Sequence, residues 1–326
     1  MKRLFKASAA VFAALALVIG TANIAQAVAT RTLAAGNVLY GLDGAGAGTH
    51  GTLYNIDPLT GAVTTVGSRG GAGTYDYAYQ GAFNPVDGQI YWSGSVSDGE
   101  HLWKTNPSTG AATLVATFTE NGSNTTINAL AIGADGRAFG TSQSKLFSVN
   151  LTTGALTRIT ASLPIDMFYA FAFNPADSRF YAVANNDANG GLFTFDVTNG
   201  TATRLIPMAN FPNLGAGTGA NARRLYSIAF DKNGSLWGTN QNGEIISNVV
   251  TGASAADFIT GAQVAGLPGS TWANGLAITY PASNGSEESL ANTGTEDGVQ
   301  VALATGAALA IAIGSTLTVY GRRRNR

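Results

Sequence analysis

The sequence predicts an all-β fold made of repeated four-stranded units. Three observations favour it: two hairpin patterns that recur, a regular spacing between copies, and chain ends that each carry part of one unit. The repeating region runs from residue 37 to residue 280. Self-similarity over such a span is typical of architectures in which each unit buries its faces against its neighbours.

The first recurring pattern is a short apolar strand, a turn that ends in Thr-Gly or Asn-Gly, and a second strand. Turn residues of this kind between two apolar runs indicate a hairpin. Four copies are clear and a fifth is degenerate: LYNIDPLTGAVTTV (53–66), LWKTNPSTGAATLV (102–115), LFSVNLTTGALTRI (146–159), LFTFDVTNGTATRL (192–205) and EIISNVVTGASAADF (244–258). Their turn glycines lie 44 to 52 residues apart, at Gly61, Gly110, Gly154, Gly200 and Gly252.

A second hairpin pattern lies between these copies. An alternating apolar strand meets an Asp, Asn or Gly turn and continues into another apolar strand. The instances are AFNPVDGQIYW (82–92), AIGADGRAFG (131–140), AFNPADSRFYA (172–182) and AFDKNGSLWG (229–238). Each unit is therefore expected to hold four antiparallel strands.

The two ends of the repeating region complete one further unit. GLAITY (275–280) matches a first strand with no hairpin after it, and NVLYGLD (37–43) matches a second strand with no first strand before it. Together they make five units. Four-stranded units at this spacing are typical of propeller blades, so we expect a five-bladed β-propeller over residues 28–281, closed by pairing of the N-terminal and C-terminal strands.

The N-terminus carries an export signal. Lys2, Arg3 and Lys6 precede an apolar run over residues 7–20, which we expect to be helical, and Ala25-Gln26-Ala27 supplies the small residues of a signal-peptidase site. Residues 1–27 are thus expected to be removed, with Ala25 and Ala27 as the recognised positions.

The C-terminus has three parts. A flexible spacer is expected over residues 282–289, from its Ser, Asn, Gly and Glu content. The apolar run 299–320 is long enough to span a bilayer as a helix, and the basic residues after it favour the cytoplasmic side. Before the run stands a pentapeptide, made of Leu290, Ala291, Asn292, Thr293 and Gly294.

In this order, residues 290–326 resemble the cell-wall sorting signal of Gram-positive surface proteins, and Ala291 matches the LAxTG variant of its motif. The resemblance implies that sortase cleaves after Thr293 and joins its carbonyl to a peptidoglycan precursor, so that residues 299–320 anchor the chain only transiently. A permanent membrane anchor with a chance pentapeptide is the alternative. The hairpin units resemble those of secreted β-propellers.

Charge and cysteine content exclude several classes of function. The chain has a net charge of −1, and residues 28–293 carry 11 basic and 17 acidic residues, a net charge of −6. Nucleic acid is therefore not expected as a partner, because its phosphates need a basic surface. The absence of cysteine excludes thiol catalysis and cysteine-ligated metals.

The expected ligand site lies where the innermost strands begin. Aligning these strands places one residue of each unit at the mouth of the central channel, on the face with the long loops: Tyr79, Asn128, Tyr169, Tyr226 and Asn274. Aromatic and amide side chains stack on sugars and bond their hydroxyls. The alternative is that the tyrosines pack between units and the asparagines cap strand ends.

The sequence offers no convergent catalytic set. The acids expected on the same face occupy no repeated position: Asp43, Asp76, Asp98, Glu100, Asp166 and Asp187. We therefore expect no cofactor and no metal, and we expect a recognition or adhesion module for a glycan or extracellular protein. A surface hydrolase or lyase that uses these carboxylates, and a structural envelope component, are the alternatives.

Overall fold

The chain divides into two compact units, Met1–Ala282 and Ser283–Arg326. The computed structural model describes only parts of the first unit, and these parts form the propeller. The described residues are 33–42, 52–68, 75–96, 99–185, 189–211, 224–240, 244–249, 258–263 and 275–280.

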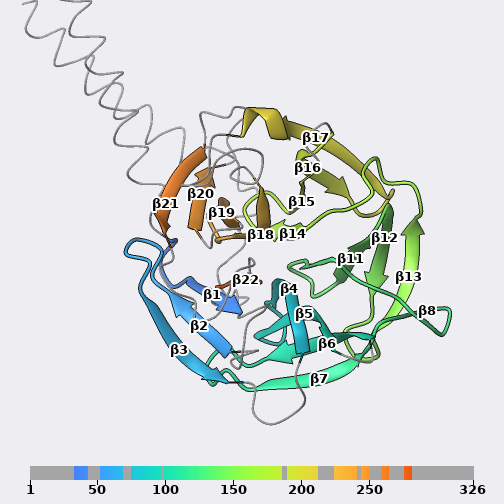
Figure 1. The fold of residues 1–326 in the computed structure, drawn as a ribbon, viewed down its shortest axis with the longest axis horizontal. Helices are drawn as coiled ribbons and strands as arrows, with labels where there is room; N and C mark the ends of the chain where they lie inside the picture. Colours follow the sequence, from blue (N-terminus) through green and yellow to red (C-terminus); the bar gives the residue numbers. More distant parts are fainter. Residues whose placement is uncertain are drawn as a thin grey trace, which may run out of the picture. The chain divides into compact units, whose positions relative to one another are not determined.

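Within the first unit, five β-sheets surround a central axis (Figure 1), which confirms the predicted all-β, five-bladed β-propeller. We number the sheets as blades 1 to 5. The described residues contain no α-helix, only one 3₁₀ turn, η1 (Met208–Asn210).

In every blade the strands succeed one another from the axis to the rim. Blade 1 contains, in this order, β22 (Leu276–Thr279), β1 (Val38–Leu42), β2 (Thr52–Ile56) and β3 (Val63–Ser68). Blade 2 contains β4 (Tyr75–Asn84), β5 (Gln89–Val96), β6 (Gly99–Thr105) and β7 (Ala112–Thr117). Blade 3 contains β10 (Ala129–Ile132), β11 (Ala138–Ser142), β12 (Lys145–Val149), β13 (Ala155–Thr160), β8 (Thr119–Glu120) and β9 (Ser123–Asn124). Blade 4 contains β14 (Ala170–Asn174), β15 (Arg179–Ala184), β16 (Gly191–Asp196) and β17 (Thr201–Pro207). Blade 5 contains β18 (Leu225–Phe230), β19 (Ser235–Asn240), β20 (Glu244–Val249) and β21 (Phe258–Gln263).

The innermost strands lie side by side around the axis. Each contacts the innermost strand of the next blade, from β4 through β10, β14 and β18 to β22, and β22 contacts β4. In blade 1, β22 pairs antiparallel with β1, and Val38 lies opposite Thr279. Strands from the two ends of the repeating region therefore share one sheet.

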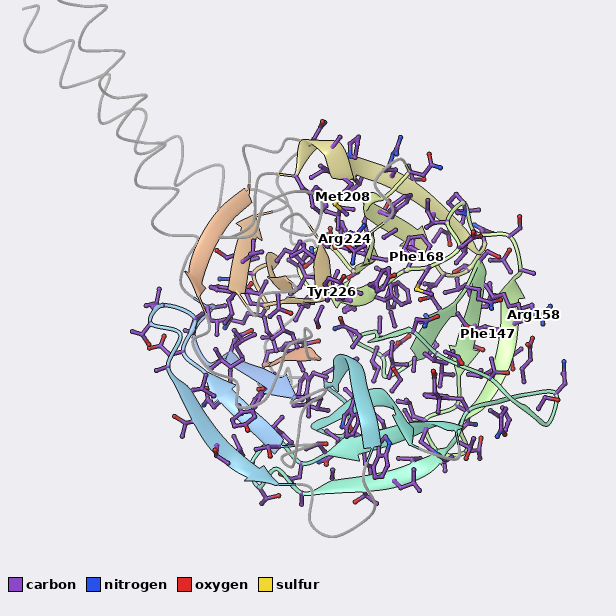
Figure 2. The ribbon with its side chains drawn as sticks, viewed as in Figure 1. Phe147, Arg158, Phe168, Met208, Arg224 and Tyr226 are labelled. Atoms are coloured by element: carbon purple, nitrogen blue, oxygen red, sulfur yellow. The ribbon has the colours of Figure 1, made fainter. Side chains whose placement is uncertain are left out.

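Blade 3 departs from the expected four antiparallel strands. The link after β7 forms the short hairpin of β8 and β9, and β8 pairs in parallel with the outer strand β13. Arg158 on β13 forms a salt bridge with Glu120 on β8 at 2.5 Å, on the outer rim of the blade (Figure 2). The prediction of four strands was wrong here because the pairing joins residues that are distant in sequence.

The core lies between the blades. Five clusters of buried apolar side chains each join residues from two adjacent blades. Between blades 1 and 2, the stacked indoles of Trp92 and Trp103 lie 5.5 Å apart, and Trp92 Nε1 donates to Thr105 Oγ1 at 2.8 Å. Burial of each sheet against its neighbours thus supplies the hydrophobic stabilisation of the ring.

The turns of the first hairpin pattern share one geometry. In blades 1 to 4 an Asp or Asn side chain accepts the N–H two residues later at 2.8 to 2.9 Å, and the turn glycine has φ between 66° and 71°. A glycine suits this left-handed backbone because it has no Cβ. A Cβ on Gly110 would lie 2.6 Å from Gly67 Cα in the preceding blade, so this turn also forms an inter-blade contact.

The outer strand of blades 1 to 4 carries a β-bulge at the same place. In blade 2, Leu102 pairs with Ala116 and Trp103 with Leu114, which leaves Val115 as the extra residue. The equivalent residues are Val66, Ile159 and Leu205. All four are partly buried against the apolar cluster that joins their blade to the next. The bulge therefore turns one apolar side chain of the outer strand toward the neighbouring blade.

Candidate functional site

The two faces of the propeller differ in how they connect strands. We call the face with the tight turns between β4 and β5 and between β6 and β7, and their equivalents, the turn face. The opposite face, which holds the links between blades, is the loop face. The innermost strands begin at the loop face, where the predicted ring of five residues would lie.

Two of the five predicted residues contact each other. Tyr169 directly precedes β14, and Tyr226 lies at the start of β18 near the axis (Figure 2). Their ring centroids are 5.4 Å apart at 67°, an edge-to-face arrangement. Tyr169 is 36% exposed and Tyr226 is half-buried. Adjacent blades thus present an accessible aromatic pair at the channel mouth.

The other three predicted residues are described to different extents. Asn128, which precedes β10, is half-buried, and its Oδ1 accepts the Gln143 N–H at 3.4 Å. Gln143 is exposed and has φ of 51°. Tyr79 lies within β4, but its side chain is not among those described, and Asn274 lies outside the described residues. The structure therefore brings together one pair, and it leaves the complete ring a prediction.

The link between blades 3 and 4 holds Tyr169 in place. Leu163, Ile165 and Phe168 are buried in the cluster between these blades, and the Leu163 N–H donates to Ser144 O at 2.8 Å. Met167 is 37% exposed between these anchors. Three buried residues of the link thus anchor it, while Met167 and Tyr169 stay exposed.

A buried polar network lies directly beneath the mouth. Gln80 is 1% exposed, and the two hydrogens of its Nε2 are shared among three carbonyl oxygens, Gly81 O and Ile228 O at 2.7 Å and Leu276 O at 3.2 Å. Its Oε1 accepts from Ser227 Oγ at 2.9 Å and from Ile228 N at 3.1 Å. Ser227 Oγ also accepts from Leu276 N at 2.7 Å. One side chain thereby joins the inner strands of blades 2, 5 and 1.

Sequence reasoning missed Gln80, although the aligned inner strands contain a signal for it. At the corresponding position the other blades have small residues, namely Ala129, Ala170, Ser227 and Gly275. A single long amide in a set of small residues indicates a side chain that reaches across the channel, because there is no room for five such side chains around one axis.

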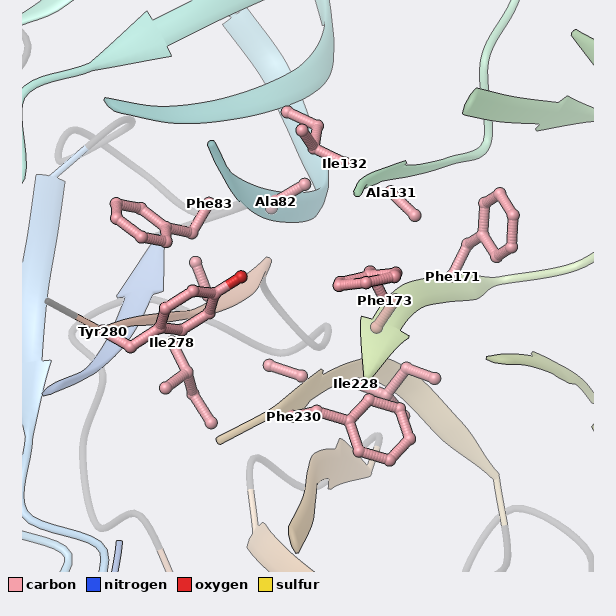
Figure 3. A pocket seen from close by; sticks show the side chains of 14 residues that line it. Ala82, Phe83, Ala131, Ile132, Phe171, Phe173, Ile228, Phe230, Ile278 and Tyr280 are labelled. Atoms are coloured by element: carbon pink, nitrogen blue, oxygen red, sulfur yellow. The ribbon is translucent and has the colours of Figure 1, made fainter. Parts of the chain in front are cut away.

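Nearer the turn face, the channel is narrow, and its lining side chains are apolar apart from the Tyr280 hydroxyl. The inner strands of all five blades line a cavity of about 30 Å³. Figure 3 shows Phe83, Phe173 and Phe230 around it, with Tyr280 beside Phe83. The rings of Phe83 and Tyr280 meet edge to face at 5.1 Å, and burial raises the pKa of Tyr280 to about 12. This volume suits a few water molecules at most.

Of the six predicted loop-face acids, the structure describes the side chains of Glu100 and Asp166. The Glu100 carboxylate accepts the Ile127 N–H at 2.8 Å, and burial raises the pKa of Glu100 above its ordinary value. Asp166 is exposed. The side chains of Asp43, Asp76, Asp98 and Asp187 are not described. Within the described ranges, no group of three or more His, Asp or Glu side chains is placed to hold a metal ion.

The predicted targeting segments lie outside the described residues. These segments are residues 1–27, with Ala25 and Ala27, and residues 290–326, with the pentapeptide Leu290–Gly294 and the apolar run 299–320. Among the residues that are described, no helix is long and apolar enough to cross a membrane. The expectations of export and wall attachment therefore stay predictions.

Comparisons with known proteins give solved structures of low sequence identity. No match to a curated protein was found. Three similar solved structures are a chain of a nidogen/laminin complex, TolB from Acinetobacter baumannii, and a symmetrical protein studied for its de novo evolutionary emergence. Their identities to this chain are 12%, 16% and 18%, and their TM-scores are 0.49, 0.43 and 0.43. The alignments cover 76%, 69% and 75% of this chain, and 99%, 53% and 98% of the other chains.

One family model matches part of the sequence. Residues 68–222 match a repeat of unknown function (DUF6923), and this range contains all the strands of blades 2, 3 and 4. The match is therefore to a segment that holds several complete blades of this propeller.

Proposed function

We propose that this chain is a surface protein of a Gram-positive cell, anchored covalently to the wall through Thr293, and that its propeller is a recognition module. The ligand is a glycan or an extracellular protein, and it binds at the channel mouth on the loop face. In this proposal the pairing of β22 with β1 closes the ring that holds the mouth rigid.

The single observation that carries the recognition proposal is the Tyr169–Tyr226 pair. The two rings come from adjacent blades, have centroids 5.4 Å apart, and are partly open to solvent. Aromatic side chains on a rigid support lose little conformational entropy on binding, and they stack on sugars as well as on protein side chains. The neighbouring amide of Asn128 adds hydrogen-bonding capacity.

A second candidate is a purely structural role in the cell envelope. The channel favours it, because the cavity near the turn face is only about 30 Å³ and no charged side chain lines it. Such a channel does not take up a ligand of ordinary size. The two candidates differ in one outcome: a structural component has no ligand that depends on the mouth tyrosines.

Recognition is tested by binding of the full-length protein to an immobilised panel of glycans and extracellular matrix proteins. The variants Tyr169→Ala and Tyr226→Ala are expected to weaken binding about tenfold or more, as for aromatic residues at the centre of an interface. Val86→Ala is the control, because Val86 is 68% exposed in a turn on the turn face. Binding that survives both tyrosine substitutions would contradict the proposed site.

Anchoring is tested separately, by fractionating cells of a sortase-containing Gram-positive host. Thr293→Ala should move the protein from the wall fraction to the membrane or the medium. Thr295→Ala, two residues further on and outside the pentapeptide, should leave it in the wall fraction. Unchanged wall attachment of the Thr293 variant would remove the sortase argument and leave the recognition proposal untouched.

A further inference from the structure

Blade 1 is the blade that combines strands from the two ends of the repeating region. In each other blade, a short turn on the turn face connects the innermost strand to the next strand, as between β4 and β5. In blade 1 these two strands are β22 and β1, which are more than 230 residues apart; no turn joins them, and they are held together by backbone hydrogen bonds and by side-chain packing. β22 is therefore the inner strand that can separate from its neighbour without breaking a covalent connection.

Two bonds of the polar network beneath the mouth reach this strand, both at Leu276. Leu276 N donates to Ser227 Oγ at 2.7 Å, and Leu276 O accepts from Gln80 Nε2 at 3.2 Å. These bonds add to the ladder between β22 and β1 and to the Leu42 N–H bond to Gly275 O at 2.9 Å. Gly81 also allows close approach, because a Cβ there would lie 3.1 Å from Leu276 O.

The same network lies next to the predicted mouth residues. Gln80 directly follows Tyr79, and Ser227 directly follows Tyr226. Gln80 Oε1 accepts hydrogen bonds from both Ser227 Oγ and Ile228 N, so it holds β18 at the two residues that directly follow Tyr226. A buried amide with all its bonds made fixes its partners firmly, because losing one partner leaves a buried polar group unpaired.

We propose that Gln80 is a positioning residue that holds β22 in the ring and fixes Tyr226 against Tyr169. The inference rests on the proposed function only in treating the mouth as the recognition surface. The proposal predicts that the placement of β22 and the geometry of the tyrosine pair both depend on the Gln80 side chain. Gln80 contacts the inner strands of blades 2, 5 and 1, and it is not one of the five predicted ring residues.

The first measurement is hydrogen exchange of the full-length protein, followed by mass spectrometry. Gln80→Leu keeps the approximate size of the side chain and removes its hydrogen bonds. Exchange in the peptide that contains residues 275–280 should accelerate about tenfold more than exchange in residues 170–174 of blade 4. Gln89→Leu is the matched control, because Gln89 is half-buried on β5 and no side-chain bond of Gln89 is present among the described residues.

The second measurement is ¹⁹F NMR of the full-length protein labelled with 3-fluorotyrosine, with Tyr169→Phe and Tyr226→Phe to assign the two resonances. Gln80→Leu should shift the Tyr226 signal, since an edge-to-face pair depends on ring geometry. Gln89→Leu should not. A general loss of stability would leave the folded-state shift unchanged, so this measurement separates a positioning role from a merely structural one.

Ser227→Ala keeps the test usable if Gln80→Leu does not fold. It removes one hydroxyl, which directly accepts the Leu276 N–H, and it should accelerate exchange of β22 in the same way. Equal acceleration in β22 and in blade 4, or an unmoved Tyr226 resonance, would overturn the proposal. Neither measurement uses a ligand, so a failed panel experiment and a failed Gln80 experiment are distinguishable.

Discussion

On the turn face, the hairpins of blades 1 to 4 repeat one set of contacts, whereas on the loop face the described links differ from each other. Each repeated turn has a side-chain oxygen bonded to the N–H two residues on and a glycine with positive φ. By contrast, the link from blade 2 to blade 3 contains β8 and β9, and the link from blade 3 to blade 4 contains no strand. The regular face builds the scaffold, and the irregular face holds the individual contacts that a specific ligand requires.

The largest expected effect is on the scaffold. Deleting residues 275–280 removes β22 from blade 1, and with it the buried side chains of Leu276 and Ile278. The residues that remain in the cluster between blades 1 and 5, such as Leu39 and Trp237, then lose apolar contacts. We expect loss of cooperative thermal unfolding. Deletion of six residues from the expected spacer, 283–288, is the control. If the protein without residues 275–280 melts like its parent, β22 is not required for closure.

The next largest effect is the loss of stability when a turn glycine on the turn face is replaced. It compares a glycine that is needed only for its backbone conformation with one that also contacts the neighbouring blade. Gly88 and Gly110 have nearly equal φ, 70° and 71°, but a Cβ on Gly88 meets nothing within 4 Å, whereas one on Gly110 meets Gly67. Gly88→Ala should cost about 1 kcal/mol, and Gly110→Ala about 3 kcal/mol or more. Denaturant unfolding measures both. Equal losses of stability would mean that Gly67 can move away from a Cβ at position 110 at no cost in free energy.

A smaller effect tests the bulge of the outer strands. Val115 is turned toward the cluster between blades 2 and 3, while its neighbour Leu114 is 47% exposed. Val115→Ala should destabilise by about 1 kcal/mol, and Leu114→Ala by less than about 0.5 kcal/mol. The opposite order would show that the bulged residue does not stabilise the joint between blades.

The smallest effect concerns pH and the loop face. Burial raises the pKa of Glu100, against the opposing hydrogen bonds from Ile127 and Thr126. The Glu100 carboxyl therefore binds its proton more tightly in the folded protein than in the unfolded chain. Its contribution to the free energy of unfolding is present at low pH and is lost as pH rises through the raised pKa of Glu100. Glu100→Gln should become more stable relative to its parent as pH rises above the ordinary pKa range of a glutamate. Asp166→Asn, at an exposed acid of the same face, is the control. If the stability difference between Glu100→Gln and its parent does not change with pH, the expected effect of Glu100 is contradicted.

The sequence predicted the regular part of the molecule well, for a local reason. Turn chemistry at residues such as Asp57 and Gly61 determines a hairpin within a few residues, so the repeated hairpins could be found from local patterns. The blade count needed one further step, the matching of residues 37–43 with residues 275–280. The register of the innermost strands followed from their shared apolar ending. That register assigns Tyr169 and Tyr226 to equivalent positions of adjacent blades, and their ring centroids lie 5.4 Å apart.

The irregular part could not be predicted in the same way. The parallel pairing of β8 with β13 joins residues 119–120 to residues 155–156, and nothing in either short segment indicates the other. Gln80 was missed because its importance lies in the reach of its side chain to Ile228 and Leu276 and not in any local pattern. Such contacts depend on the whole ring being assembled.

The central claim, that recognition takes place on the loop face, is tested most directly by blocking one face at a time. The chain has no cysteine, so Ser162→Cys on the exposed link between blades 3 and 4 and Ser108→Cys in an exposed turn of blade 2 each provide one attachment point. Each full-length variant is coupled to a bulky maleimide polymer and measured on the panel of glycans and matrix proteins. The account predicts that coupling at position 162 abolishes binding and that coupling at position 108 leaves it unchanged. Binding lost at position 108 and retained at position 162 would contradict it.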